Sequence, residues 1–205
     1  MNIAFLASHG GSNMQAVIDA CKAGRLDARP VVVICNNAGA PALDRAARAG
    51  IPGYHLCVGR RCPDEAALDR EILATLRRHA ADLIVLAGYM KKIGPTVLAA
   101  YRGRIVNIHP ALLPRFGGRG MYGRHVHAAV LAAGERETGV TVHLIDENYD
   151  TGPILAQVTV PVRPDDTVDS LAARVLEREH VILSETLQRI VQGDIKLPAA
   201  SGPAP

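Results

Sequence analysis

Tryptophan is absent from this 205-residue sequence and phenylalanine occurs only twice, so the hydrophobic core must rest on Val, Ile, Leu and Ala. The four cysteines form no C-x-x-C pair and share no spacing with a histidine cluster, which argues against zinc and favours reduced thiols. No apolar run approaches the roughly 18 residues that a membrane span requires. The start of the chain lacks the basic and apolar segments of a signal peptide. We therefore expect no bound metal, no membrane partner and a cytoplasmic location.

Tracts of one charge are also missing. The formal net charge is +3, and the Lys and Arg residues are spread along the chain. This distribution gives little support to nucleic-acid binding and fits a local pocket for a small anion better. Hydrophobic residues make up 48% and charged residues 21% of the chain, the balance of a globular protein. The length fits a single domain, which we place at residues 1–196, followed by a disordered tail at residues 197–205.

Strand-like and helix-like segments alternate through the first half of the chain. Several strand-like runs are continuously apolar, as expected for parallel strands that are covered on both faces. The segments between them show helical spacing, as in Leu68, Ile72 and Leu76. The pattern predicts a single-domain α/β fold with a Rossmann-like, doubly wound, mostly parallel sheet and helices on both faces. The predicted strands are 2–7, 30–35, 53–57, 82–88 and 104–108, and the predicted helices are 13–22, 41–49 and 65–78.

After the fifth predicted strand, the alternation gives way to two further strands and a long helix. That helix can begin at Thr167 or Asp169, because both are good N-cap residues, and Gly193 marks its end. His125 and His127 lie two apart, a spacing that directs them to different faces of a helix and argues against a metal pair. The remaining predicted elements are a Gly-rich basic loop at 115–124, a helix at 125–133, strands at 139–145 and 154–162, and the long helix up to 192.

The first candidate site is the turn ASHGGSNMQ, residues 7–15, between the first predicted strand and helix. Gly10 and Gly11 let the backbone curl, and the amides near Ser12 and Asn13 would open the helix. Free N–H groups and the helix dipole favour a phosphate there. The turn matches neither the dinucleotide-binding pattern nor the P-loop. A simple helix cap formed by Ser12 explains the same residues equally well.

The second candidate site is RIVNIHPALLPRF, residues 104–116. Residues two apart on a strand face the same side, so Asn107 and His109 project together from the carboxyl end of the fifth strand. Open α/β sheets bind ligands at that end. Asn can donate a hydrogen bond to a developing oxyanion, and His can move a proton near neutral pH. An Asn that ends the strand and a His held by loop carbonyls are the structural alternative.

The third candidate site is the acidic turn within VHLIDENYDTGPIL, residues 142–155. Asp146, Glu147 and Asp150 lie in a predicted loop, where acids are more often solvated than catalytic. A catalytic His needs a partner that orients it and stabilises its cation, and a carboxylate from a neighbouring loop can serve. Asp150, next to the Gly-Pro turn that follows, is the best placed of the three.

These segments together resemble the folate-dependent formyltransferases, above all the phosphoribosylglycinamide formyltransferase family (glycinamide ribonucleotide transformylases) of purine biosynthesis. The resemblance extends to about Lys196. The combination N-x-H-P-x-L-L-P followed by D-x-G is specific to folate-dependent formyltransferases, whereas each fragment alone is far weaker. The matching segments, in this order and at these intervals, are GGSN (10–13), LAGYM (86–90), NIHPALLP (107–114), TVH (141–143) and DENYDTGPI (146–154).

The resemblance implies transfer of a formyl group from the cosubstrate 10-formyltetrahydrofolate to the amine of glycinamide ribonucleotide. Both partners are then small molecules. The implied site has a catalytic trio with one supporting residue, a phosphate cradle with a glutamate for the ribose hydroxyls, and a folate-binding loop. The catalytic trio is Asn107, His109 and Asp150, and His143 is the supporting residue. The phosphate cradle is Gly11, Ser12 and Asn13, and Glu179 is the glutamate for the ribose hydroxyls. The folate-binding loop is Met90, Lys91 and Ile93, with further backbone contacts around Asp146 and Glu147.

In the implied mechanism, the substrate amine attacks the formyl carbon, and Asn107 and the His109 imidazolium hold the tetrahedral oxyanion. Asp150 pairs with His109, favours its charged form and positions a water for proton transfer to the leaving N10. No Ser or Cys lies in the catalytic motifs, so no covalent intermediate is required. Catalysis then rests on the orientation of two substrates and on electrostatic stabilisation.

Some features depart from the pattern of the family. His9 replaces a small residue in the phosphate turn, and Lys92 stands where the folate loop is usually apolar. Thr151 replaces a common Gly after the catalytic Asp and could stiffen that turn. The loop at 117–127 is longer than in many relatives, so no ligand contacts are transferred to it.

Two other functions stay open at this point. One is a related folate-dependent formyltransferase that acts on an amino-sugar nucleotide, and the other is a non-catalytic nucleotide-binding module. A structure in which Asp150 cannot approach His109, or in which Asn107 points into the core, would favour the module. The sequence also leaves open whether the protein is a monomer or a homodimer.

Overall fold

The computed structural model describes residues 1–59 and 61–198, and these residues form one seven-stranded sheet in the order β3-β2-β1-β4-β5-β6-β7. β1 to β5 pair in parallel, and β6 and β7 extend the sheet as antiparallel strands. The strands are β1 Asn2–Ala7, β2 Arg29–Cys35, β3 Gly53–His55, β4 Leu83–Leu86, β5 Ile105–His109, β6 Glu137–Leu144 and β7 Ile154–Pro161.

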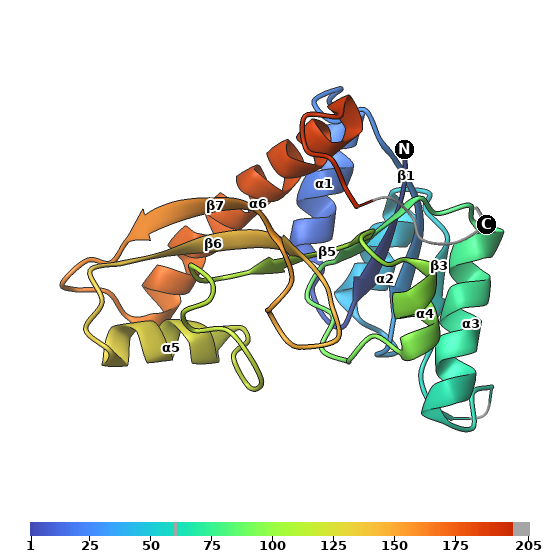
Figure 1. The fold of residues 1–205 in the computed structure, drawn as a ribbon, viewed down its shortest axis with the longest axis horizontal. Coiled ribbons are helices and arrows are strands. Elements are labelled where there is room, and N and C mark those ends of the chain that lie inside the picture. The colour runs from blue at the N-terminus through green and yellow to red at the C-terminus, as the bar shows by residue number, and fades with distance from the viewer. Residues whose placement is uncertain (60, 199–205) are drawn as a thin grey trace.

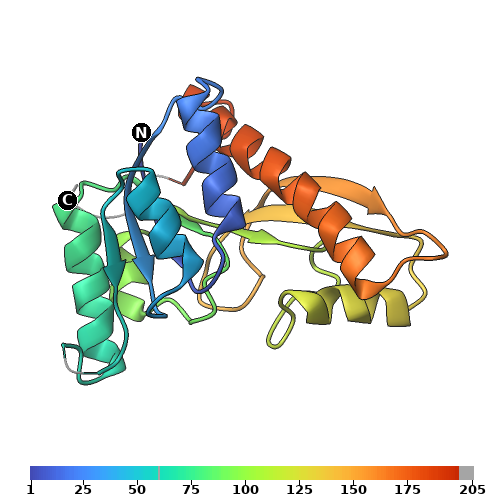
Figure 2. The same cartoon turned by 180° about the vertical axis from the view of Figure 1, so that it is seen from behind.

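Helices cover both faces of this sheet (Figure 1). α1 and α6 pack against each other on one face, as Figure 2 shows, and α3 and α4 pack together on the other. The predicted α/β fold, doubly wound around a mostly parallel sheet, is therefore confirmed. The helices are α1 Ser12–Lys22, α2 Pro41–Arg48, α3 Glu65–Arg78, α4 Pro95–Ala100, α5 Arg124–Ala132 and α6 Val168–Gln192.

Successive residues of the central strands enter two different hydrophobic cores. In β1, Phe5 packs in the core that includes residues of α1, α2, α5 and α6, whereas Leu6 packs in the core that includes residues of α3 and α4. Both side chains are fully buried, and each such burial stabilises the fold by roughly 1.5–3 kcal/mol. Burial on two faces explains why these strands are continuously apolar rather than alternating.

The face of the sheet that packs against α3 and α4 carries polar side chains where it reaches β5 and β6. There it carries Asn107 and His109 of β5, and His143 of β6 lies directly opposite Asn107. The loops 110–123 and 145–153 lie over this part of the face and contact it through hydrogen bonds and ion pairs. The topology thus places polar side chains at the carboxyl end of a parallel strand, beneath two loops.

The ends of α6 follow from local sequence. Thr167 is the N-cap, its side chain accepts a hydrogen bond from the Ser170 N–H at 3.1 Å, and Ser170 Oγ accepts one from the Thr167 N–H at 3.0 Å. Of the two predicted start residues, Thr167 is confirmed, while Asp169 lies inside the first turn. Gly193 ends the helix in the left-handed conformation that glycine adopts without steric cost.

The helix α4 is not predicted by the sequence pattern, and β3 ends at His55, two residues before its predicted end. α4 has six residues, too few to show a helical period. Its N-terminus is capped from α3 instead: the buried Asp69 carboxylate accepts hydrogen bonds from the N–H groups of Thr96 at 2.7 Å and Val97 at 3.2 Å. Such a cap from a distant residue leaves no local signal in the sequence.

The C-terminal segment returns to the body of the fold. Leu197 packs against the core that includes α6, and residues 199–205, the rest of the predicted tail, lie outside the described residues. In the part of the chain that the structure describes, no helix has both the length and the apolar character needed to cross a membrane.

Candidate active site

Asn107 and His143 form a directly opposed pair across β5 and β6. His143 is fully buried, and its Nδ1–H donates to the Leu144 carbonyl at 2.9 Å, which leaves Nε2 to accept from Asn107 Nδ2 at 3.2 Å. Burial lowers the pKa of His143 and keeps the imidazole neutral, as this bonding requires. His143 therefore fixes the amide of Asn107 and leaves the second N–H of that amide available to a ligand.

His109 is almost completely buried, at 3% exposure. Its Nε2 lies 2.8 Å from the Phe116 carbonyl, and its Nδ1 lies 3.7 Å from Oδ2 of Asp150. Both ring nitrogens thus face acceptors, one a loop carbonyl and the other a carboxylate. His109 is therefore held between the two loops that cover this part of the sheet.

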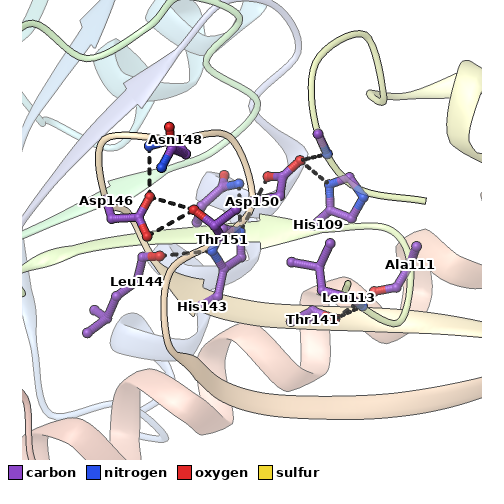
Figure 3. A network of polar contacts seen from close by, with 12 residues as sticks. His109, Ala111, Leu113, Thr141, His143, Leu144, Asp146, Asn148, Asp150 and Thr151 are labelled. Atoms are coloured by element: carbon purple, nitrogen blue, oxygen red, sulfur yellow. Dashed lines mark hydrogen bonds and ion pairs between the residues drawn. The ribbon is translucent and has the colours of Figure 1, made fainter. Parts of the chain in front are cut away.

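The Asp150 carboxylate lies between the two imidazoles, as Figure 3 shows. Its Oδ1 is 3.6 Å from Nε2 of His143, and its Oδ2 accepts a hydrogen bond of 2.8 Å from the Gly118 N–H. The separations from the imidazoles are longer than hydrogen bonds, a common state of catalytic groups before substrate binds. The structure thus brings Asn107, His109 and Asp150 together, with His143 beneath them.

The turn that follows His109 is held by two residues that sequence reasoning did not assign. Buried Thr141 donates from Oγ1 to the Ala111 carbonyl at 2.6 Å and accepts from the Leu113 N–H at 3.0 Å. Gln157 adds a hydrogen bond of 2.9 Å to the Leu113 carbonyl. The position of Thr141, two residues before His143 and on the same face of β6, is the signal that could have identified it.

The glycine turn ends at an uncapped helix N-terminus. Gly11 is the N-cap of α1, in the left-handed conformation at φ 67°, and among the described residues no side chain caps the helix. The interpretation of Ser12 as the cap is therefore wrong, because Ser12 is the first residue inside the helix. Arg45 supports the turn by donating from Nε to the Gly10 carbonyl at 2.9 Å. Free N–H groups and the positive end of the helix dipole make this terminus suited to an anion.

Glu179 of α6 lies beside this helix terminus. Asn13 donates from Nδ2 to Glu179 Oε2 at 2.6 Å, and both side chains are buried. Burial raises the pKa of Glu179 to about 7, while the hydrogen bond from Asn13 lowers it and only partly compensates. Asn13, predicted to contact the phosphate, and Glu179, predicted to contact the ribose, thus form a hydrogen bond that links α1 to α6.

A pocket of about 90 Å³ opens next to Asn107 and Asp150. Four of the five residues named for folate binding line it, and the fifth, Met90, does not. The Met90 side chain is 45% exposed, and its N–H donates to Ser8 Oγ at 2.7 Å. A neighbouring cavity of about 720 Å³ shares several lining residues with this pocket, including Lys92. The four lining residues are Lys91, Ile93, Asp146 and Glu147.

Buried Ser8 joins the glycine turn before α1 to the segment that follows β4. Besides accepting from the Met90 N–H, its hydroxyl donates to Asn36 Oδ1 at 2.6 Å. Sequence reasoning missed this residue, because its partners lie 28 and 82 positions away. Within residues 1–59 and 61–198, no group of three or more His, Cys, Asp or Glu residues is arranged to hold a metal ion.

The residues that depart from the expected family pattern have definite places. His9 and Lys92 are exposed, and Thr151 bonds the Asp146 carboxylate. The predicted long loop at 117–127 ends earlier, because α5 begins at Arg124, and the exposed Arg124 forms an ion pair with Asp169 of α6.

Comparison with known proteins settles the family. The family model described as "Formyl transferase" matches residues 1–187. The chain belongs to the formyl transferase family. The predicted resemblance is thus confirmed.

Curated relatives cover nearly the whole chain. Phosphoribosylglycinamide formyltransferase of Escherichia coli (strain K12) is 38% identical over 197 residues, which are 96% of this chain and 90% of the relative. The chloroplastic phosphoribosylglycinamide formyltransferase of Arabidopsis thaliana is 40% identical over 194 residues, 95% of this chain but 66% of the relative. The chain therefore spans just under two thirds of the length of the plant relative.

Crystal structures of related proteins share the fold. Glycinamide ribonucleotide transformylase 1 from Symbiobacterium toebii aligns with a TM-score of 0.89 at 36% identity, covering 98% of this chain and 92% of that chain. The corresponding protein from Geobacillus kaustophilus aligns with a TM-score of 0.85 at 42% identity, covering 92% and 97%. The chain thus has the α/β fold of the formyl transferases.

Proposed function

We propose that this formyl transferase moves the formyl group of 10-formyltetrahydrofolate to the amine of glycinamide ribonucleotide, N1-(5-phospho-D-ribosyl)glycinamide. The products are formylglycinamide ribonucleotide and tetrahydrofolate, and the pathway is de novo purine (IMP) biosynthesis. The observation that carries the proposal is the Asp150 carboxylate within 3.7 Å of His109 and 3.6 Å of His143, beside Asn107. The names of the similar proteins support the choice of substrate.

The reaction needs an oxyanion site and a route for one proton. The amine nitrogen forms a bond to the formyl carbon, and the oxygen becomes an oxyanion that accepts from the second N–H of Asn107 and from the Nδ1–H of His109, the ring nitrogen that does not bond the Phe116 carbonyl. The bond from that carbon to N10 then breaks, and the proton lost by the amine passes to N10 through a water held by Asp150. A single oxyanion donor is worth about 3–4 kcal/mol in other enzymes, and orientation of two substrates several kcal/mol more.

The ribonucleotide would bind at the start of α1. The backbone amides of Gly11, Ser12 and Asn13 face the phosphate, because the helix terminus there has no side-chain cap. Glu179 accepts hydrogen bonds from the ribose hydroxyls, and its bond from Asn13 holds it next to the phosphate position.

The folate would bind along the segment that follows β4. Met90, Lys91 and Ile93 pack against the pteridine, and the backbone around Asp146 and Glu147 closes the pocket that contains Asn107 and Asp150. Exposed Lys92, together with Lys91, would attract the anionic glutamate tail of the folate. Residues 1–196 form the catalytic domain in this proposal, which acts in the cytoplasm as a monomer or homodimer.

The two alternative functions differ in what they require of the site. A formyltransferase for amino-sugar nucleotides would use the same catalytic residues, so only the substrate tells the two enzymes apart. A nucleotide-binding module without catalysis has no use for a carboxylate that lies between two imidazoles. The approach of Asp150 to His109, and the position of Asn107 on the pocket wall, therefore favour an enzyme.

The proposal is tested by mixing the purified protein with 10-formyltetrahydrofolate and glycinamide ribonucleotide and following the release of tetrahydrofolate. We expect turnover that depends on the amine, so ribose 5-phosphate, which lacks the amine, gives none. Turnover with an amino-sugar nucleotide alone would support the related formyltransferase instead. Absence of turnover with every amine would overturn the proposed function.

A further inference from the structure

The loop between β6 and β7 holds Asp150 in a conformation that it does not favour by itself. Asp150 has φ 57°, in the left-handed region that residues other than glycine rarely adopt. Its carboxylate must nevertheless stay between the imidazoles of His109 and His143. Contacts elsewhere in the loop therefore have to hold this backbone in place.

Thr151, the next residue, supplies such contacts. Its hydroxyl lies 2.8 Å and 3.0 Å from the two carboxylate oxygens of Asp146, to which it can donate. The Asn148 N–H donates to the same carboxylate at 2.8 Å (Figure 3). The Thr151 hydrogen bonds tie Asp146, near the start of the loop, to the residue that follows Asp150, and we call this arrangement the loop brace.

The backbone that follows Thr151 packs tightly against the end of β6. A Cβ on Gly152 would collide with the Leu144 carbonyl, so the chain there lies directly on the end of β6. The backbone that follows Asp150 is thus held by the brace at Thr151, and the Asp150 carboxylate itself accepts a hydrogen bond from the Gly118 N–H at 2.8 Å. With the backbone after Asp150 and its carboxylate both held, the side chain has little freedom to turn away from the imidazoles.

The brace also shapes the pocket beside the site. The pocket of about 90 Å³ is lined by the consecutive loop residues 146–150 together with Asn107. Because the hydrogen bond between Asp146 and Thr151 closes this part of the loop, a change at either residue alters the wall of the pocket and the position of Asp150 together.

We propose that Thr151 is a positioning residue for formyl transfer, and that its hydroxyl, bound to Asp146, sets the Asp150 carboxylate before either substrate arrives. The catalytic part of this statement rests on the proposed function, whereas the brace itself does not. Thr151 touches no reacting atom in this account and acts through Asp150 alone.

The kinetic test compares Thr151→Val, which keeps the shape and removes the hydroxyl, with Thr151→Ser, which keeps the hydroxyl. We expect Thr151→Val to lower kcat about tenfold, since small misplacements of catalytic groups have effects of this order or larger. KM for the ribonucleotide should stay unchanged, because its phosphate binds at α1. Thr151→Ser should keep kcat within about twofold of the wild type.

A matched control is Thr159→Val, at an exposed threonine of β7 for which the described residues provide no side-chain hydrogen bond. It should leave kcat and both KM values unchanged. Wild-type kcat in Thr151→Val, or an equal loss in Thr151→Ser, would overturn the proposal.

A double-mutant cycle tests whether Thr151 acts through Asp146. Because both residues serve one brace, Asp146→Ala combined with Thr151→Val should lower kcat no further than the more damaging single change. Multiplying losses in the double variant would show that the two residues act separately, contrary to the proposal.

A third measurement needs no substrate. The Gly118 amide donates to Asp150 and should exchange its hydrogen faster in Thr151→Val than in the wild type, Thr151→Ser or Thr159→Val. Unchanged exchange in Thr151→Val would refute the brace. Absence of formyl transfer by the wild type would refute the proposed function and leave this result standing, so the two failures are distinguishable.

Discussion

Asp150 combines a left-handed backbone with a carboxylate that lies within 4 Å of two imidazoles. In the proposed function, this carboxylate orients His109 and holds the water that carries the proton. The Gly118 N–H fixes one of its oxygens, and the other is turned toward His143. We therefore propose that Asp150 acts in turnover and has no part in holding the ribonucleotide.

Asp150→Asn keeps the shape of the side chain and removes this charge. We expect kcat to fall by about 10²–10⁴, the usual contribution of a positioned acid–base group. Calorimetric binding of ribose 5-phosphate should be unchanged, because the phosphate cradle lies on α1. His109→Ala should show the same division between turnover and binding. An equal loss of ribonucleotide affinity in either variant would contradict the assignment.

The raised pKa of Glu179 predicts how the free energy of unfolding depends on pH. Burial raises its pKa from an ordinary value near 4.5 to about 7, so the folded protein keeps a proton that the unfolded chain has lost between these values. This group therefore lowers the free energy of unfolding as the pH rises from about 4.5 to about 7. Glu179→Gln removes the titration and can still accept from Asn13. Relative to the wild type, the variant should gain up to about 3 kcal/mol by pH 8.

Urea unfolding of both proteins at pH 5 and pH 8 measures this difference. Parallel pH dependence of the two free energies would mean that the Glu179 pKa is not raised by burial.

Some of these residues could be predicted from local pattern and others could not. Asn107 and His109 are predictable because strand geometry places residues two apart on one face. The meeting of Asp150 with them depends on how a distant loop folds over the sheet, so the local pattern marks Asp150 only as the best placed of three acids, and the family resemblance adds its pairing with His109. Ser8 and Thr141 act through partners far away in the sequence, so no local pattern reports their roles.

At the scale of elements, the start of α1 offers a matched pair of glycines. Gly11 and Gly24 have nearly equal φ angles, 67° and 68°, at opposite ends of the helix. A Cβ on Gly11 would lie 3.0 Å from Ala42 Cβ, whereas a Cβ on Gly24 would meet nothing within 4 Å. Both alanine substitutions cost about 1–2 kcal/mol through the left-handed backbone.

Gly11→Ala should raise KM for the ribonucleotide about tenfold, with a smaller effect on kcat, because it moves the amides that face the phosphate. Gly24→Ala should lose similar stability without changing KM. Steady-state kinetics and thermal unfolding of the two variants separate these effects. An unchanged KM in Gly11→Ala would count against the phosphate cradle.

Elements with strong local signals were predictable from sequence alone. The capping box at Thr167 and the terminal Gly193 define α6 through contacts between near neighbours. α4 depends instead on the Asp69 carboxylate from another helix, so local sequence does not predict it. The start of α1 was misinterpreted because Ser12 suits an N-cap, while the structure uses Gly11 there.

At the scale of the whole molecule, the two substrates are assigned to different parts of one edge of the sheet. In the proposed function, α1 and α6 would bind the ribonucleotide, and the loops around β4, β5 and β6 would bind the folate. The alternation of apolar strands and helices was enough to predict this sheet and its edge. The way in which the loops 110–123 and 145–153 close over it was not, since loop contacts lack periodicity.

This separation predicts how a partial ligand changes stability. Ribose 5-phosphate at about 100 times its Kd should stabilise the fold by about 2.7 kcal/mol. For a chain of this size, that corresponds to a rise in Tm of roughly 5–10 °C. Asp150→Asn should show the same rise and Gly11→Ala a smaller one, as measured by calorimetry. Loss of the rise in Asp150→Asn would mean that the two sites are not separate.

The central claim is that the site passes a formyl group to an amine rather than to water. The most direct measurement supplies 10-formyltetrahydrofolate labelled with carbon-13 in the formyl group, together with glycinamide ribonucleotide, and follows the label by NMR. We expect the label to appear as a formamide on the ribonucleotide, in equal amount to the tetrahydrofolate released. Label that appears as free formate, or that stays on the folate, would contradict it.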